Sequence, residues 1–145
     1  MHPIHILLVE DNEGDILLTK EALNQGKIIN TISVVKDGKE AINYMEKNSP
    51  YTESLLPDLI LLDINLPKMN GHEVLQNLKS NNNFKQIPVI MFTTSSSERD
   101  ILKSYKNYAN CYITKPVEVD DFLDTIKSIE NFWIGIVQLS TTNPT

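Results

Sequence analysis

The sequence is poor in cysteine, in clustered basic residues and in long hydrophobic runs, and each shortage excludes a class of protein. Cys111 is the only cysteine among 145 residues, so an internal disulfide is impossible and a reducing compartment is expected. A net charge of −6 without a Lys/Arg run argues against nucleic-acid binding and against attraction to an anionic membrane. No stretch is long enough for a membrane span, and the N-terminus lacks the basic start of a signal peptide. We therefore expect a cytoplasmic protein of one domain.

Five short runs of apolar and β-branched residues predict buried strands, and segments with helical spacing follow each of them. The runs are residues 4–9, 31–35, 59–62, 87–92 and 111–113. The helical segments are residues 13–25, 39–47, 72–80, 97–107 and 118–132, the first of them opening after Asn12 as N-cap. Runs that are apolar almost throughout are typical of parallel strands covered on both faces. The pattern predicts a doubly wound α/β fold with a five-stranded parallel sheet.

Polar side chains follow four of these strands, where each strand ends. They are Glu10 and Asp11, Asp63 and Asn65, Thr93, and Lys115. Each alone is commoner as a cap or a loop residue, but the carboxyl ends of parallel strands meet at one edge of the sheet. Three carboxylates gathered there repel one another, and a divalent cation relieves that repulsion. Oxygen ligands without His or Cys favour Mg²⁺ over zinc, and a carboxylate beside Mg²⁺ can accept a phosphoryl group.

These residues resemble the receiver domain of two-component response regulators. "LLVEDN" is similar to that family's acidic pair, "LLDINLPKMNG" to its phosphoacceptor strand and loop, "VIMFTT" to its signalling Thr strand, and "YITKP" to the strand with its switch aromatic and Lys-Pro. The likeness covers residues 4–132. It implies a flavodoxin-like receiver fold with strand order 2-1-3-4-5 and a role in phosphorelay signalling.

The resemblance implies a metal site and a phosphoacceptor. Asp63 would accept the phosphoryl group. Glu10 and Asp11 would hold Mg²⁺ together with Asp63 and the backbone carbonyl of Asn65. Glu10 departs from the Asp that many members carry at this position, but its longer arm still supplies a carboxylate.

The resemblance also implies a switch. Thr93 would contact the phosphoryl group and move on activation, and Tyr112 would change rotamer with it. Lys115 would contact the phosphoryl oxygens, and its bond to Pro116 would be cis, as is usual in this family. Such a protein phosphorylates and dephosphorylates only itself and is not an enzyme that turns over a substrate.

A narrower likeness points to the small single-domain regulators that partner phytochrome-linked histidine kinases. It is carried by the long connection at 48–57, by "NCYITKP" and by "IENFW". It implies a sensor histidine kinase as partner. Because we expect the receiver domain to be residues 1–132, with only a C-terminal extension at 133–145, the signal would pass to a downstream protein or a phosphotransfer partner.

Three other functions fit parts of the pattern. A phosphatase-like enzyme with an aspartyl nucleophile would usually carry its nucleophile on the first strand. A flavin- or nucleotide-binding domain would need a first loop rich in Gly, Ser or Thr, whereas "VEDNEGD" would repel phosphate. A pseudo-receiver that serves only as an interaction module should lack Asp63 or Lys115. The three histidines, His2, His5 and His72, have no metal-ligand spacing, so we expect them at the surface or in caps.

The segment "FWIGIVQL" at 132–139 predicts a homodimer. It follows a helix that already has an apolar face, and exposing it would be unfavourable by about 25 cal/mol per Å² of apolar area. The alternative is that the segment folds back over its own domain. Tyr105, Tyr108 and Tyr112, which cluster near the fourth helix and fifth strand, favour an interface with two-fold symmetry.

Overall fold

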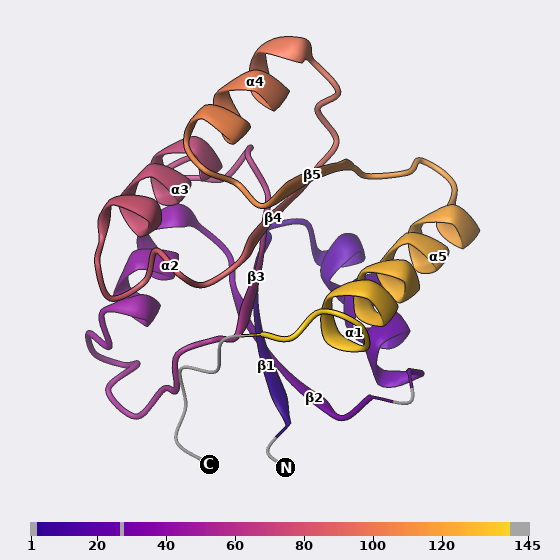
Figure 1. Cartoon of the computed structure of the whole chain (residues 1–145), viewed down its shortest axis with the longest axis horizontal. Helices are drawn as coiled ribbons and strands as arrows, with labels where there is room; N and C mark the ends of the chain where they lie inside the picture. Colours follow the sequence, from indigo (N-terminus) through magenta and orange to yellow (C-terminus); the bar gives the residue numbers. More distant parts are fainter. Residues whose placement is uncertain (1–2, 27, 140–145) are drawn as a thin grey trace.

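The computed structural model describes residues 3–26 and 28–139. Five parallel strands form one sheet in the order β2-β1-β3-β4-β5, which confirms the predicted fold class and strand order (Figure 1). The strands are β1 (Ile4–Val9), β2 (Asn30–Val35), β3 (Leu59–Leu62), β4 (Val89–Thr93) and β5 (Cys111–Thr114). The helices are α1 (Glu13–Asn24), α2 (Gly38–Met45), α3 (Gly71–Ser80), α4 (Glu98–Lys106) and α5 (Val119–Ile129), and a π-helical turn, η1 (Glu130–Ile134), continues from α5.

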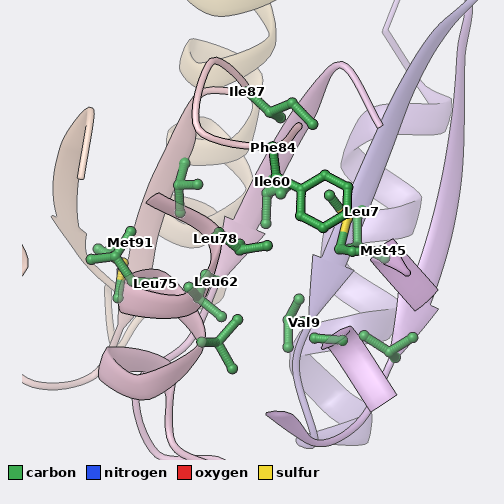
Figure 2. Packing of buried hydrophobic residues seen from close by; sticks show 14 of the residues in the cluster. Leu7, Val9, Met45, Ile60, Leu62, Leu75, Leu78, Phe84, Ile87 and Met91 are labelled. Atoms are coloured by element: carbon green, nitrogen blue, oxygen red, sulfur yellow. The ribbon is translucent and has the colours of Figure 1, made fainter. Parts of the chain in front are cut away.

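The helices cover both faces of the sheet, because the side chains of each strand alternate between them. Leu7 and Val9 of β1 pack with residues of α2 and α3 on one face, and Figure 2 shows these side chains pointing toward one another. Ile6 and Leu8, on the opposite face of the same strand, pack with α1 and α5. Each fully buried side chain of this size stabilises the fold by about 1.5–3 kcal/mol. The two cores hold the central strands rigidly, so the residues that follow those strands are accurately placed.

Four helices begin with a side-chain cap close to the carboxyl edge of the sheet. Asn12, Asp37, Asn70 and Ser97 each accept a hydrogen bond from a backbone N–H in the first turn of α1, α2, α3 and α4. Short polar side chains at these positions satisfy N–H groups that have no partner inside the helix. The predicted N-cap at Asn12 is confirmed. The turns between strand and helix are therefore well defined.

The observed elements differ from the predicted ones mainly at their ends. β4 begins at Val89 rather than residue 87, because Pro88 has no N–H to donate to the sheet. α5 ends at Ile129, where η1 changes the hydrogen-bond pattern of the predicted helix at 118–132. Within the described ranges, no helix has the length and apolar character that crossing a membrane requires.

Candidate functional site

The site lies at the carboxyl edge of the sheet, where the ends of three strands bring charged side chains together. Lys115, which follows β5, places its Nζ 3.1 Å from Asp63 Oδ2 after β3 and also donates a hydrogen bond to Glu10 Oε1 after β1. All three side chains are nearly buried, being 3% exposed for Lys115, 3% for Glu10 and 9% for Asp63. The sequence predicted this convergence, and the structure places the three residues in direct contact.

Backbone hydrogen bonds between strands hold these residues in place. The Asp63 N–H donates to Val9 O at 3.1 Å, and the Lys115 N–H donates to Thr93 O at 2.6 Å. The start of α3 also abuts Asp63, because a Cβ on Gly71 would lie 2.0 Å from the Asp63 carbonyl oxygen. Only glycine allows so close an approach of the helix to the strand end. The position of the Asp63 carboxylate is thus determined by its neighbours on both sides.

The charges of the site shift the pKa of two of its groups. Burial, the largest effect, raises the pKa of Glu10 to about 7, and the charge of Asp63 adds to it, while the hydrogen bond from Lys115 opposes it. Burial alone would lower the pKa of Lys115, but the hydrogen bonds to Glu10 and Asp15 and the charge of Asp63 outweigh it and raise that pKa. Lys115 is therefore a permanent cation that partly compensates the carboxylates around it.

Three carboxylates can face one cation in this arrangement. Glu10, Asp11 and Asp63 each offer an oxygen, and these oxygens lie within 4.8 Å of one another. Asp11 is exposed, so one side of the cluster is open to solvent. A set of hard oxygen donors with surplus negative charge fits Mg²⁺. Asn65, the fourth predicted contributor, is exposed in the connection after β3.

Asp15 is a member of the site that the sequence reasoning missed. Its Oδ2 accepts a hydrogen bond from Lys115 Nζ at 2.9 Å, from the first turn of α1. Asp15 stands three residues after the N-cap Asn12, in the first turn of α1. Because α1 starts directly after β1, its first turn lies at the same edge of the sheet. That combination of signals points to Asp15.

Thr93 and Tyr112 lie on adjacent strands beside this site. Thr93 is completely buried, and its Oγ1 has no hydrogen-bond partner among the described residues. Tyr112 is half-buried; its hydroxyl donates to Ser95 O at 2.8 Å, and its backbone N–H donates to Tyr105 Oη at 3.1 Å. Tyr112 is thereby tied to the connection that directly follows Thr93.

Two expectations about individual residues were wrong. The cis peptide bond within the described ranges is Ser49–Pro50, and the bond between Lys115 and Pro116 is not cis. His5 and His72 were expected at the surface or in caps, but they are only 8% and 6% exposed. Both can be buried because their ring Nε2 atoms find polar partners inside the protein. His2 lies outside the described residues.

Comparison with known proteins agrees with this geometry. Rcp1, a response regulator of the cyanobacterium Synechocystis, is 41% identical over 137 residues, which cover 94% of this chain and 93% of Rcp1. The crystal structure of RcpA, a phosphorylated cyanobacterial phytochrome response regulator, superposes with a TM-score of 0.94 at 42% identity and covers 97% of this chain and 100% of RcpA. The Mn²⁺-bound form of Rcp1 gives a TM-score of 0.93 at 40% identity, with 96% and 100% covered.

The family assignment rests on most of the chain. Residues 6–127 match the response regulator receiver domain, a span that includes β1 from Ile6 onward, the other four strands and every residue of the charged cluster. Neither the phosphatase-like enzyme nor the pseudo-receiver is favoured by these likenesses. The chain therefore belongs to the response regulator receiver domain family.

Proposed function

We propose that this receiver accepts a phosphoryl group on Asp63 from a sensor histidine kinase, in a reaction that depends on Mg²⁺. The observation that supports the proposal most directly is the buried contact of Lys115 with Asp63, next to the buried carboxylate of Glu10 and the exposed carboxylate of Asp11. Receiver domains are signalling proteins rather than enzymes in the usual sense. Catalysis by this chain is proposed to be limited to its own phosphorylation and dephosphorylation.

Each residue of the site has a proposed part in the transfer. A carboxylate oxygen of Asp63 forms the new P–O bond, while the P–N bond of the kinase phosphohistidine breaks and its electron pair returns to the imidazole. Glu10, Asp11, Asp63 and the backbone carbonyl of Asn65 would hold Mg²⁺, which neutralises charge on the transferring oxygens when it is bound. Lys115, already 3.1 Å from Asp63, supplies a second positive charge.

Thr93 and Tyr112 are the proposed switch. The buried Thr93 hydroxyl has no partner among the described residues, so a phosphoryl oxygen on Asp63 would be its first acceptor. If Thr93 moves toward Asp63, the connection after β4 moves with it. The Tyr112 hydroxyl is bonded to that connection through the Ser95 carbonyl. A rearrangement at the site would reach Tyr112 by this route, and the surface formed by α4 and β5 would report it.

Mass spectrometry after incubation with acetyl phosphate tests the reaction. We expect one phosphoryl group on Asp63 with Mg²⁺, none with EDTA, and none in Asp63→Asn. Asp124→Asn is the matched control, because it removes a carboxylate from the exposed face of α5, away from the charged cluster. Equal labelling of Asp63→Asn and wild type, or labelling that needs no divalent ion, would refute the proposal.

The kinase is proposed to be a phytochrome-linked histidine kinase. RcpA, 42% identical to this chain, is a phytochrome response regulator. The signal would pass in the cytoplasm to a downstream protein or a phosphotransfer partner. Phosphotransfer from a purified cyanobacterial phytochrome kinase should be at least tenfold faster than from a histidine kinase of an unrelated sensor class. Equal rates would contradict the proposed phytochrome-linked kinase but would leave the proposed role of Asp63 intact.

We also propose a homodimer, with a receiver domain at 1–132 and the extension at 133–145 taking part in the interface. Phe132 and Ile136 are 52% and 72% exposed, although Trp133 and Ile134 pack on the core of their own domain. Phe132 and Trp133 line a groove of about 420 Å³ with Asp121 and Asp124 of α5. The exposed face of α4 carries cations instead, namely Arg99, Lys103 and Lys106. Such opposite charges favour a two-fold pairing in which α4 meets α5.

Sedimentation velocity at tens of micromolar tests the dimer. Ile136→Asp should produce a monomer, whereas Leu17→Asp, at a 65% exposed position on α1, should leave the dimer intact. A monomeric wild type, with or without beryllofluoride, would contradict the dimer. A dimeric Ile136→Asp would show that the extension is not its cause.

A further inference from the structure

A chain of hydrogen bonds joins the first turn of α3 to Tyr112 without passing through Thr93. It begins at His72, whose Nε2 lies 3.0 Å from Asp100 Oδ1 in the first turn of α4. The other carboxylate oxygen of Asp100 accepts a hydrogen bond from the Ser95 hydroxyl at 2.6 Å. The Ser95 carbonyl in turn accepts the Tyr112 hydroxyl at 2.8 Å. Three elements that are distant in the sequence are thereby connected.

His72 makes this contact at a cost to the fold. The residue is 6% exposed, and its ring Nδ1 has no hydrogen-bond partner among the described residues. Because the Asp100 carboxylate can only accept, Nε2 donates the proton of this hydrogen bond, and Nδ1 is left as a buried polar atom without a partner among the described residues. Such an atom is destabilising, and an apolar side chain would fill the same space without that penalty. The hydrogen bond to Asp100 therefore calls for a functional explanation.

Asp100 links His72 to the connection between β4 and α4, residues 94–97. Hydrogen bonds from Ser95, which has the largest effect, and from His72 lower the pKa of Asp100, so the group is ionised at neutral pH and only accepts. Its backbone N–H also donates to Ser97 Oγ, the N-cap of α4, at 3.1 Å. Asp100 thus holds the Ser95 side chain from a fixed point on α4. This orients the Ser95 carbonyl.

We propose that His72, acting through Asp100, is a positioning residue for the Tyr112 switch. It holds the Ser95 carbonyl where the Tyr112 hydroxyl can reach it and so stabilises the half-buried position of Tyr112. The proposal rests on the proposed function in which Tyr112 changes rotamer. A contact shifts a two-state element only if it differs between the two states, and the bond from Tyr112 to Ser95 differs in this way. His72 therefore sets the ratio of the two Tyr112 positions before any phosphoryl group arrives.

Fluorine NMR of the full chain labelled with fluorotyrosine measures that ratio. The chain has five tyrosines, and Tyr112→Phe identifies the resonance of Tyr112. His72→Leu keeps the volume but removes the donor, and we expect it to shift the ratio toward exposed Tyr112 by about fivefold, the effect of one hydrogen bond of ordinary net strength. His72→Gln retains an N–H donor and should stay close to wild type. The thermal stability of His72→Leu should equal or exceed that of wild type.

A second variant tests the same connection from the other end. Ser95→Ala removes the hydroxyl bonded to Asp100 but keeps the carbonyl, so it should shift Tyr112 in the same direction, and it decides the question if His72→Leu does not fold. An unchanged Tyr112 resonance in Ser95→Ala overturns the proposal, as does a shift in His72→Leu that His72→Gln reproduces fully. Labelling of Asp63 is measured in the same samples. Absence of labelling in wild type would refute the proposed function alone, because the Tyr112 ratio is measured without a phosphoryl group.

Discussion

β1 and β3 carry polar residues at both of their ends, and the two groups differ in how their charges are balanced. At the carboxyl edge, Lys115 alone contacts several carboxylates, including Glu10 and Asp63. We call this set, together with Asp11 and Asp15, the carboxyl-edge cluster. At the amino edge, the His5 side chain contacts the uncharged side chains of Ser33 and Tyr44. Both groups lie on the same rigid strands, so the strands alone do not explain the difference.

The amino-edge cluster, formed by His5, Ser33, Tyr44 and Asp58, is joined by hydrogen bonds. His5 Nε2 lies 2.8 Å from Ser33 Oγ and 3.1 Å from the Tyr44 hydroxyl. The Asp58 carboxylate accepts a hydrogen bond from the backbone N–H of His5 at 3.0 Å, and the backbone N–H of Asp58 donates to the His5 carbonyl at 2.7 Å. A network of this kind secures the connection between α2 and β3. The carboxyl-edge cluster keeps surplus negative charge instead, which suits a site that takes up a cation.

Removing Lys115 should produce the largest effect on stability. It is also the most direct test of the difference in charge balance between the two clusters. Lys115→Ala leaves buried Glu10 and Asp63 without the cation that contacts them in the described part of the chain, so the free energy of unfolding without metal should fall by about 3–5 kcal/mol. Mg²⁺ should restore part of the loss by binding the native state. Urea unfolding with EDTA or Mg²⁺ measures both effects. Lys127→Ala, on the exposed face of α5, is the control, and a loss as small as that of the control would contradict this account.

Breaking the amino-edge cluster should be less costly and should not respond to metal. Asp58→Ala removes the acceptor of the buried His5 N–H, and we expect a loss of about 1–3 kcal/mol in the free energy of unfolding. Asp58→Asn keeps an oxygen that can accept and should lose less. Mg²⁺ should leave the difference between wild type and Asp58→Ala unchanged, and Asp63 should still be phosphorylated. If Mg²⁺ rescued Asp58→Ala, the two clusters would be one coupled system.

The sequence predicted every member of the carboxyl-edge cluster except Asp15, but it did not predict the amino-edge cluster, and the reason is physical. Glu10 and Asp63 directly follow an apolar run and Lys115 comes two residues after one, and the topology of a parallel sheet brings such positions to one edge. His5 lies inside such a run, and its partners Ser33 and Tyr44 come from β2 and α2. The environment of a buried histidine depends on contacts between residues that are distant in the sequence, and no local sequence pattern indicates such contacts.

The fold itself was predicted well because burial determines the pattern of the central strands. The runs at 4–9 and 59–62 are β1 and β3 to the residue, since these strands are covered on both faces. The π-helical turn after Ile129 was not predicted, because residues 130–134 continue the apolar spacing of the preceding helix. Hydrogen-bond registers of this kind depend on packing against neighbouring elements.

The two clusters should also respond to pH in opposite directions when metal is absent. Burial raises the pKa of Glu10 from 4.5 to about 7, so its contribution to stability is complete below 4.5 and is lost as pH rises through about 7. Burial lowers the pKa of His5 from 6.5, so the contribution of neutral His5 is complete above 6.5 and is lost as pH falls below it. Unfolding free energies from pH 4 to 8 in EDTA test this. Glu10→Gln should remove the loss on the alkaline side and His5→Gln the loss on the acidic side, and identical profiles would refute the assignment.

The smallest effect should come from Asp11, the exposed member of the carboxyl-edge cluster. Asp11 offers an oxygen within 4.8 Å of those of Glu10 and Asp63, so it is repelled by them when no cation is bound. Asp11→Asn should therefore raise the free energy of unfolding in EDTA by about 1 kcal/mol or less, since water screens a charge at the surface. The same change removes a charged ligand and should weaken Mg²⁺ binding, so that variant and wild type change order in stability when Mg²⁺ is added. Glu13→Gln, exposed in the first turn of α1, is the control and should show no such reversal. A destabilised Asp11→Asn in EDTA would mean that Asp11 stabilises the fold, and surplus charge would no longer distinguish the two ends of the sheet.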